Sequence, residues 1–361
     1  MSDDLSRSDD RSNDEAGERL AILTAGRFEG VGAKVAHGVI RYGDREVAAV
    51  VDEVFAGKTA SEVVPFCGRP VPIVATVSEA VAMGATRLLV GVAPAGGRLD
   101  TRLHGTLLEA VRGGLHVEAG LHHLLTDDAE LAAEARRTGV ELRDLRTVPN
   151  DLDVPRGGRW RTSDVDVVHT VGTDCNLGKM TVSLELHRAA RARGRGSVFV
   201  PTGQTGIAVA GWGIAVDHVV ADYVAGAGER LVAQGATRGD LLWLEGQGSL
   251  FHPAYSGVTL GLLHGAAPDV LVLVHRVGLA ATVNYPDVPL PSLPDMVAAY
   301  EYAAGFIKPA RVAAIAVDTS AIGETAARRA LEKIAEECGR PADDVVRFGS
   351  DRILDAVMAQ L

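Results

Sequence analysis

Residues 164–181, DVDVVHTVGTDCNLGKMT, place a β-branched strand, a loop bounded by glycines and a helix start in immediate succession. That order is the context of a Walker A phosphate-binding loop. Backbone N–H groups around Gly178 can turn toward phosphate oxygens, the helix adds its N-terminal dipole, and Lys179 adds a mobile positive charge. The stretch predicts a P-loop whose phosphate-contacting residues are Gly172, Thr173, Asp174, Asn176, Gly178, Lys179, Met180 and Thr181.

The loop departs from the common G-x4-G-K-[ST] spacing at two positions. Thr173 occupies the place of the first glycine, and Met180 stands where the magnesium-binding hydroxyl normally sits, with Thr181 one residue later. A GTD…GK loop of this kind resembles that of dethiobiotin synthetase-like P-loop enzymes. The alternative is an incidental glycine-rich turn, which the strand–loop–helix context disfavours. Met180 leaves open whether a magnesium ion is bound at all.

A second acidic motif lies at residues 241–249, LLWLEGQGS, where four apolar residues precede Glu245. A carboxylate at the end of a buried strand can reach a magnesium ion or an attacking water. We therefore predict Glu245 as a catalytic residue and, with Thr181, as a magnesium ligand. The same EGxG pattern resembles the corresponding strand end in dethiobiotin synthetase-like proteins. The alternative for an isolated Glu of this kind is a solvated strand end.

Polar residues also follow the neighbouring apolar runs. The loop 201–206, PTGQTG, offers Thr202, Gln204 and Thr205, and the segment after Glu245 offers Gln247, Ser249 and His252. Loops at strand carboxyl ends line the ligand crevice of a doubly wound sheet, so we predict these residues as substrate-binding, with His252 as a general base. The alternatives are ordinary turn chemistry and a structural histidine. Asp217 and Asp222 are expected on a helix, and Cys175 is expected to pack as a small residue.

The whole chain of 361 residues alternates short apolar runs with amphipathic stretches, which predicts βα units and two parallel sheets. Strands are expected at 20–24, 47–51, 72–75, 87–92 and 115–118, then at 165–171, 197–200, 241–244, 270–275 and 312–317. Residues 1–18 are polar and acidic, which is typical of a disordered tail. The Pro- and Gly-containing segment 150–161 suggests a boundary, giving a Rossmann-like domain over 19–150 and a P-loop NTPase-like domain over 151–361.

Composition excludes several classes of protein. The formal net charge is −11, which argues against a nucleic-acid surface. No apolar run approaches the roughly 20 residues that cross a bilayer, and the acidic start is unlike a signal peptide, so we expect a cytoplasmic protein without membrane partners. The three cysteines lack CxxC spacing, which supports neither disulfides nor a structural zinc site. A homo-oligomer is the common state for such enzymes.

The segments 172–186, 201–217, 244–265 and 271–276 together resemble the D-glutamate N-acetyltransferase family, which pairs a Rossmann-like domain with a C-terminal P-loop domain. The resemblance extends from about residue 20 onward. Residues 68–99 are in addition similar to the CoA-binding Rossmann domain of succinyl-CoA synthetase-like proteins, where the loop 93–97 would meet the phosphopantetheine arm or pyrophosphate. A generic βαβ unit would look much the same.

The resemblance implies transfer of an acetyl group from acetyl-CoA to an amino acid, D-glutamate by analogy. Glu245 or His252 would then take a proton from the amine, the backbone of residues 246–249 would stabilise the oxyanion, and Arg276 would bind the substrate carboxylate. Two alternatives stay open at this point. One is an ATP- and Mg²⁺-dependent enzyme that activates a carboxylate, and the other is a nucleotide-sensing regulatory protein.

Overall fold

The structure is a computed structural model that describes residues 17–93, 99–157 and 164–361. The chain forms two compact units. Unit 1 comprises the chain up to Thr147 together with Ala208–Gly211, and unit 2 comprises Val148–Ile207 and Trp212–Leu361. Nearly all of the expected tail, most of the loop 93–97 and part of the segment 150–161 lie outside the described residues. No helix in the described ranges combines the length and apolar character that crossing a membrane requires.

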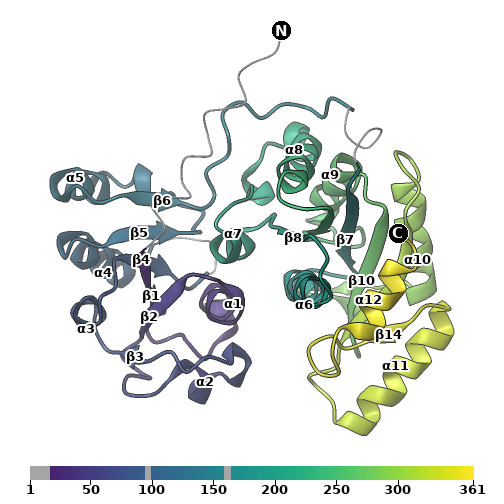
Figure 1. Cartoon of the computed structure of the whole chain (residues 1–361), viewed down its shortest axis with the longest axis horizontal. Coiled ribbons are helices and arrows are strands. Elements are labelled where there is room, and N and C mark those ends of the chain that lie inside the picture. The colour runs from purple at the N-terminus through teal and green to yellow at the C-terminus, as the bar shows by residue number, and fades with distance from the viewer. Residues whose placement is uncertain (1–16, 94–98, 158–163) are drawn as a thin grey trace. The chain divides into compact units, whose positions relative to one another are not determined.

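Unit 1 has one six-stranded parallel sheet in the order β3-β2-β1-β4-β5-β6, which is the Rossmann order. Its strands are β1 (Arg19–Leu23), β2 (Glu46–Val51), β3 (Ile73–Val74), β4 (Arg87–Val90), β5 (His116–Ala119) and β6 (Leu142–Asp144). Its helices are α1 (Lys34–Tyr42), α2 (Ala60–Val63), α3 (Val77–Ala82), α4 (Thr101–Arg112) and α5 (Ala129–Thr138). Figure 1 shows α3, α4 and α5 on one face of this sheet and α1 on the other.

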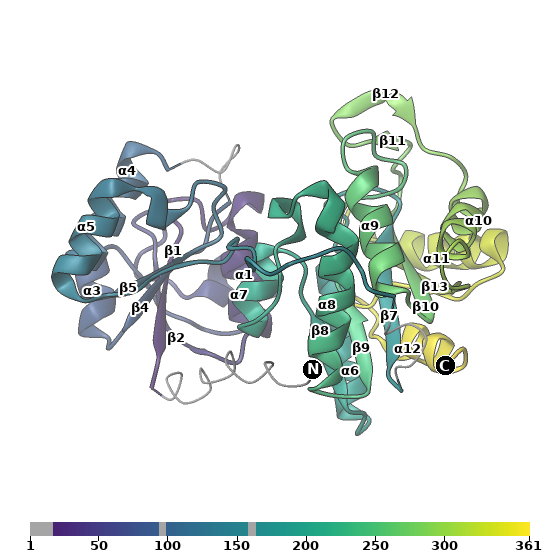
Figure 2. The same cartoon turned by 90° about the horizontal axis from the view of Figure 1, so that it is seen from above.

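Unit 2 contains a second six-stranded parallel sheet in the order β14-β13-β10-β7-β9-β8, so both predicted α/β sheets are confirmed. Its strands are β7 (Asp166–Gly172), β8 (Ser197–Val200), β9 (Leu241–Leu244), β10 (Val270–Arg276), β13 (Arg311–Asp318) and β14 (Ala342–Asp343). Its helices are α6 (Lys179–Ala192), α8 (Val224–Ala236), α9 (Ser256–Ala266), α10 (Leu293–Ala304), α11 (Glu324–Cys338) and α12 (Asp351–Met358). Helix α7 (Gln204–Ala210) is divided, since its residues up to Ile207 belong to unit 2 and those from Ala208 belong to unit 1. Strands β11 (Ala281–Thr282) and β12 (Tyr285–Pro289) form a separate antiparallel hairpin, at the top of Figure 2.

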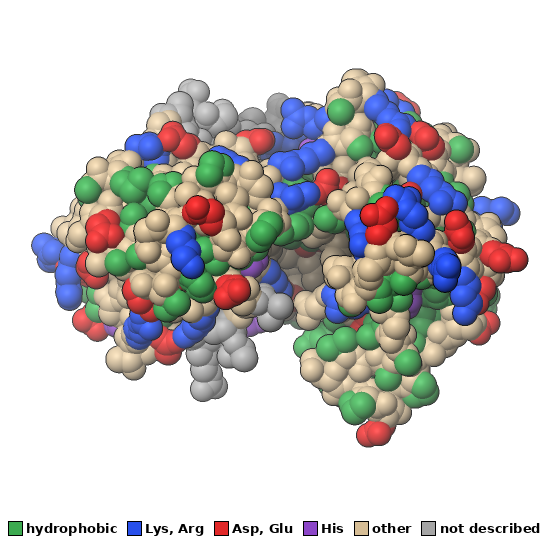
Figure 3. Space-filling model, turned by 90° about the horizontal axis from the view of Figure 1, so that it is seen from below, with side chains coloured by type: hydrophobic (Ala, Val, Ile, Leu, Met, Phe, Trp, Pro, Cys, Tyr) green, Lys and Arg blue, Asp and Glu red, His purple; other side chains and the backbone are tan. Residues whose placement is uncertain are grey.

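The side chains of the second sheet alternate between two buried faces. Leu241 and Trp243 of β9 pack in a cluster with α6 and α12, whereas Leu242 and Leu244 pack in another with α8 and α9. A third cluster joins β10 and β13 to α10 and α11. Burial on both faces explains why these strands are nearly continuous apolar runs. On the face of the molecule drawn in Figure 3, side chains of both charge signs are interspersed.

Three local expectations differ from the structure. The segment 201–206 is not all loop, because α7 begins at Gln204. Asp217 and Asp222 lie on two short 3-10 turns and not on a longer helix. The β11–β12 hairpin was not predicted, because β11 has only two residues and Pro and Asp interrupt β12.

Candidate active site

The P-loop connects β7 to α6 through two residues with left-handed backbone. Gly178 has a φ of +94° and caps α6, and Asn176 has a φ of +54°, a conformation that Asn tolerates better than most residues. Met180 and Thr181 follow in the first turn of α6, both partly buried. Because the helix begins directly after the loop, its free N–H groups face the place where a phosphate would bind.

Lys179 is folded back into the loop. Its Nζ donates a 2.8 Å hydrogen bond to the carbonyl oxygen of Asp174, and the residue is 6% exposed. Burial lowers the pKa of Lys179 to about 8. A Cβ added at Gly172 would lie 2.9 Å from this Nζ, so the glycine at the end of β7 leaves room for the ammonium group.

Glu245 is fixed by the loop after β8. Its Oε2 accepts hydrogen bonds from the backbone N–H groups of Thr202 (2.9 Å) and Gly203 (3.2 Å). The Thr202 hydroxyl donates to the Glu245 carbonyl at 2.8 Å and accepts from Gln247 Nε2 at 3.2 Å. Since β8 and β9 are neighbouring parallel strands, their carboxyl ends place these residues together. Glu245 is 5% exposed as a residue and is therefore not the solvated strand end considered above.

Glycines allow close contact between the P-loop, the loop after β8 and the segment after β9. A Cβ at Gly246 would lie 1.8 Å from the Thr170 carbonyl oxygen and 2.9 Å from Lys179 Cδ. A Cβ at Gly206 would lie 2.5 Å from Glu245 Oε2. The close packing brings the Lys179 stem against the segment that follows Glu245, so the two motifs form one site.

Tyr300 of α10, which is distant in the sequence, forms hydrogen bonds with both the P-loop strand and the segment after Glu245. Its hydroxyl donates to the Gly172 carbonyl oxygen at 2.7 Å and accepts from the Leu250 backbone N–H at 3.2 Å. Burial raises its pKa to about 12, so the phenol stays protonated and can donate. Nothing in the local sequence marks Tyr300, because its importance arises only when α10 packs on the sheet.

His252 lies buried between two tyrosines. Its ring stacks on Tyr255 with centroids 4.6 Å apart and meets the edge of Tyr285, from the hairpin, at 5.3 Å. Its Nδ1 accepts a 3.1 Å hydrogen bond from the Ala254 backbone N–H. The hairpin is also held by Asp174, whose Oδ2 accepts from the Val283 N–H at 2.6 Å.

The remaining predicted residues surround this centre. Thr173 Oγ1 lies 3.0 Å from His275 Nδ1, and burial lowers the pKa of His275 to about 4, so that ring is neutral. Arg276 donates from Nε to Asp318 Oδ2 at 2.8 Å and from Nη2 to the Asn176 carbonyl at 3.2 Å. Ser249 is buried and its Oγ accepts from the Phe251 N–H at 3.2 Å.

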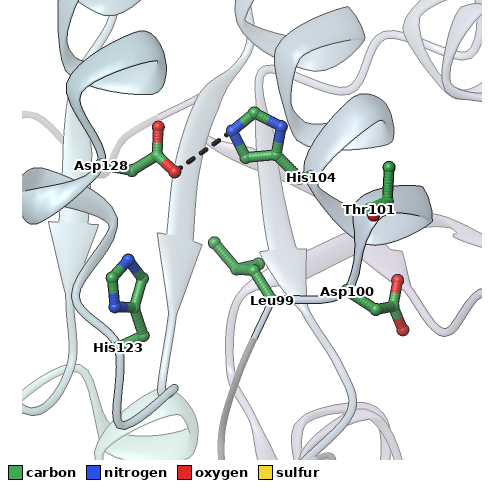
Figure 4. A pocket seen from close by; sticks show the side chains of 6 residues that line it. All are labelled: Leu99, Asp100, Thr101, His104, His123 and Asp128. Carbon is green, nitrogen blue, oxygen red and sulfur yellow. Dashed lines mark ion pairs between the residues drawn. The ribbon is translucent and has the colours of Figure 1, made fainter.

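Unit 1 contains a cavity of about 550 Å³ beside α4 and α5. Figure 4 shows the side chains that line it, which are Leu99, Asp100, Thr101, His104, His123 and Asp128. His104 Nε2 lies 3.2 Å from Asp128 Oδ2, and this carboxylate also caps α5. The size suits a small molecule. The loop 93–97, expected to meet a phosphopantetheine arm, falls almost wholly outside the described residues.

Comparison with known proteins fits this architecture. Residues 155–354 match a domain of unknown function, DUF1611_C, described as a P-loop domain, and residues 53–148 match its DUF1611_N partner, described as Rossmann-like. The chain belongs to the DUF1611 family. A DUF1611 protein of known structure, from Anabaena variabilis, is 40% identical with a TM-score of 0.89, covering 95% of this chain and 99% of that one.

Two curated relatives of the chain bear the name D-glutamate N-acetyltransferase. The protein from Tritonibacter scottomollicae is 38% identical over 82% of this chain and 88% of its own length. The protein from Pseudoalteromonas sp. is 34% identical over 77% of this chain and 83% of its own length. The family resemblance seen in the motifs is thereby confirmed, and the kinship supports an N-acetyltransferase role for this DUF1611 chain.

Proposed function

We propose that the chain transfers the acetyl group of acetyl-CoA to the amino group of D-glutamate. The observation that carries this proposal is the 38% identity to a D-glutamate N-acetyltransferase over 82% of the chain, which includes both sequence motifs of the site. The P-loop supports it independently, because CoA carries a pyrophosphate and a 3′-phosphate that such a loop can bind.

In this reaction Lys179 and the N–H groups at the start of α6 hold phosphate oxygens of the donor. The amine nitrogen of the acceptor attacks the thioester carbonyl, the C–N bond forms, and the C–S bond breaks with the electron pair leaving on sulfur. Glu245 receives the proton lost by the amine and passes it to the departing CoA thiolate, which restores the carboxylate. Arg276 has Nε and Nη2 engaged, so a substrate carboxylate would meet its Nη1.

We assign the base to Glu245 in preference to His252. A neutral imidazole has one ring lone pair, and in His252 the Ala254 N–H already occupies Nδ1. Nε2 then carries the hydrogen and has no lone pair for the amine proton. Glu245 offers a carboxylate, which has about four lone-pair sites where an imidazole has one, and two backbone N–H groups fix its orientation.

The donor set fits a P-loop magnesium site poorly. Met180 offers a thioether where a hydroxyl would bind the ion, and thioethers are weak ligands for Mg²⁺. Of the two expected ligands, Thr181 lies one residue beyond that position, and Glu245 has Oε2 bonded to two backbone N–H groups. We therefore propose transfer without ATP, and derive no step through a magnesium ion.

The test is thiol release from acetyl-CoA, without ATP, over a panel of D- and L-amino acids. We expect release with D-glutamate and the N-acetyl product by mass, with L-glutamate as the matched control. Release with another amino acid only would overturn the acceptor assignment. A reaction that requires ATP would instead favour the carboxylate-activating alternative.

A further inference from the structure

Three metal-binding side chains of different kinds meet at the P-loop, two of them within it. Asp174 and Cys175 lie in the loop after β7, and His252 lies in the segment after β9. One ligand atom from each, a carboxylate oxygen, the Sγ and a ring nitrogen, all lie within 4.8 Å of one another. Asp174 and His252 are buried, and Cys175 is partly buried.

We propose that Asp174, Cys175 and His252 bind one divalent metal ion of the zinc class. Thiolate, imidazole and carboxylate together suit Zn²⁺ or Co²⁺, whereas Mg²⁺ and Ca²⁺ prefer oxygen ligands alone. Three protein ligands leave one coordination position open, as in catalytic zinc sites. An ion with an open position can polarise a carbonyl oxygen.

The surroundings hold two of the ligands in place. Asp174 Oδ1 accepts from the Cys175 N–H at 2.6 Å and Oδ2 accepts from the Val283 N–H, so the carboxylate is oriented from both sides. Tyr255 and Tyr285 confine the His252 ring. Such second contacts are what fix ligand geometry in metal sites.

Two features set conditions on binding. Ligation must free the ring lone pair of His252 from the Ala254 N–H, so the metal replaces that hydrogen bond. The ammonium of Lys179, bonded to the Asp174 carbonyl, repels a cation. Burial raises the pKa of the Cys175 thiol to about 11, so the ion must displace the thiol proton to solvent as it binds. The bound thiolate and the Asp174 carboxylate then offset the positive charge of Lys179. The sequence spacing, which lacks any CxxC, did not reveal this site.

The test uses the full chain, stripped of metal with a chelator and titrated with Co²⁺ in the absence of acetyl-CoA. We expect one Co²⁺ per chain, a sulfur-to-cobalt charge-transfer absorption, and displacement of Co²⁺ by Zn²⁺. Cys175→Ser should abolish the charge-transfer band. His252→Gln and Asp174→Asn should each weaken Co²⁺ affinity about tenfold or more.

Cys338→Ser is the matched control, because Cys338 is also a partly buried free cysteine but ends α11. It should keep the full cobalt spectrum. Circular dichroism on each variant separates loss of a ligand from loss of fold. A wild-type chain without the charge-transfer band, or a band that survives Cys175→Ser, would overturn the proposal. Because the titration contains no acetyl donor, its outcome does not depend on whether the chain transfers acetyl groups.

Discussion

Among single residues, Lys179 has a charge that its surroundings make sensitive to pH near neutrality. Burial lowers its pKa to about 8, so the ammonium is charged at neutral pH and loses its charge as the pH rises through about 8. We expect the affinity for 3′-phospho-ADP, which lacks a thiol, to fall as the pH rises through that value. Calorimetric titration of the ligand at several pH values checks this.

The matched variant is Lys179→Met. It should bind the same ligand about 10–100-fold more weakly at neutral pH, as expected for loss of a charged hydrogen bond worth about 1.5–3 kcal/mol. Its affinity should not fall through pH 8. If wild-type and variant show the same pH profile, Lys179 does not hold the phosphates.

Glu245 supplies the second prediction at this scale. Glu245→Gln keeps an oxygen that can accept from Thr202 and Gly203 but cannot take a proton. We expect kcat for acetyl transfer to fall about 100-fold or more, with KM for acetyl-CoA changing far less. Steady-state kinetics measure both. Glu332→Gln, on the exposed surface of α11, is the control and should keep wild-type kcat.

The residues of the site were predictable to different degrees. Lys179 and Glu245 were found because each occupies a fixed place in a local motif. Tyr300 lies 128 positions from Gly172, to which it donates, and only folding brings them together. Cys175 was expected to pack as a small residue, yet it meets Asp174 and His252. Contacts between distant segments leave no trace in local spacing.

Among the elements, α10 contacts two segments of the site through one group, the Tyr300 hydroxyl. Tyr300→Phe would leave the Gly172 carbonyl without its donor and the Leu250 N–H without its acceptor. We expect the free energy of unfolding to fall by about 1–3 kcal/mol, measured by denaturant titration. Tyr302→Phe, on the same helix and 73% exposed, should change it by less than about 0.5 kcal/mol. Equal effects from both variants would contradict a stabilising role for the Tyr300 hydroxyl.

The bounds of the elements were predicted best where a residue that disfavours a strand stands at each end. The strands 197–200 and 241–244 match the structure residue for residue, since Gly or Asp precedes each and Pro or Glu follows. Helix α7 was missed because Gly206 and the β-branched Thr205 lower helix propensity. Its glycine is needed for another reason, since a Cβ there would collide with Glu245. Packing against the site overrides local preference.

For the whole molecule, the alternation of apolar strands with amphipathic helices predicted two parallel sheets. The helices that connect parallel strands cover both faces of such a sheet. The pattern could not show which charges are buried within a sheet. Glu118 of β5 is fully buried in unit 1, where both carboxylate oxygens accept from Arg45 at 3.1 Å and one also accepts from Arg143 at 3.2 Å. Each unit therefore has internal interactions of its own that can be tested separately.

Glu118→Gln removes the negative charge that both arginines share. Breaking a buried ion pair by removing one partner costs about 3–5 kcal/mol, and we expect a value near the lower end because Arg143 keeps some contact with water. Hydrogen exchange should show faster exchange for β4, β5 and β6, while β7, β9 and β10 keep their protection. Glu130→Gln on exposed α5 is the control and should leave both sheets unchanged. Equal loss of protection in both sheets would mean that the two units unfold as one, in spite of their separate cores.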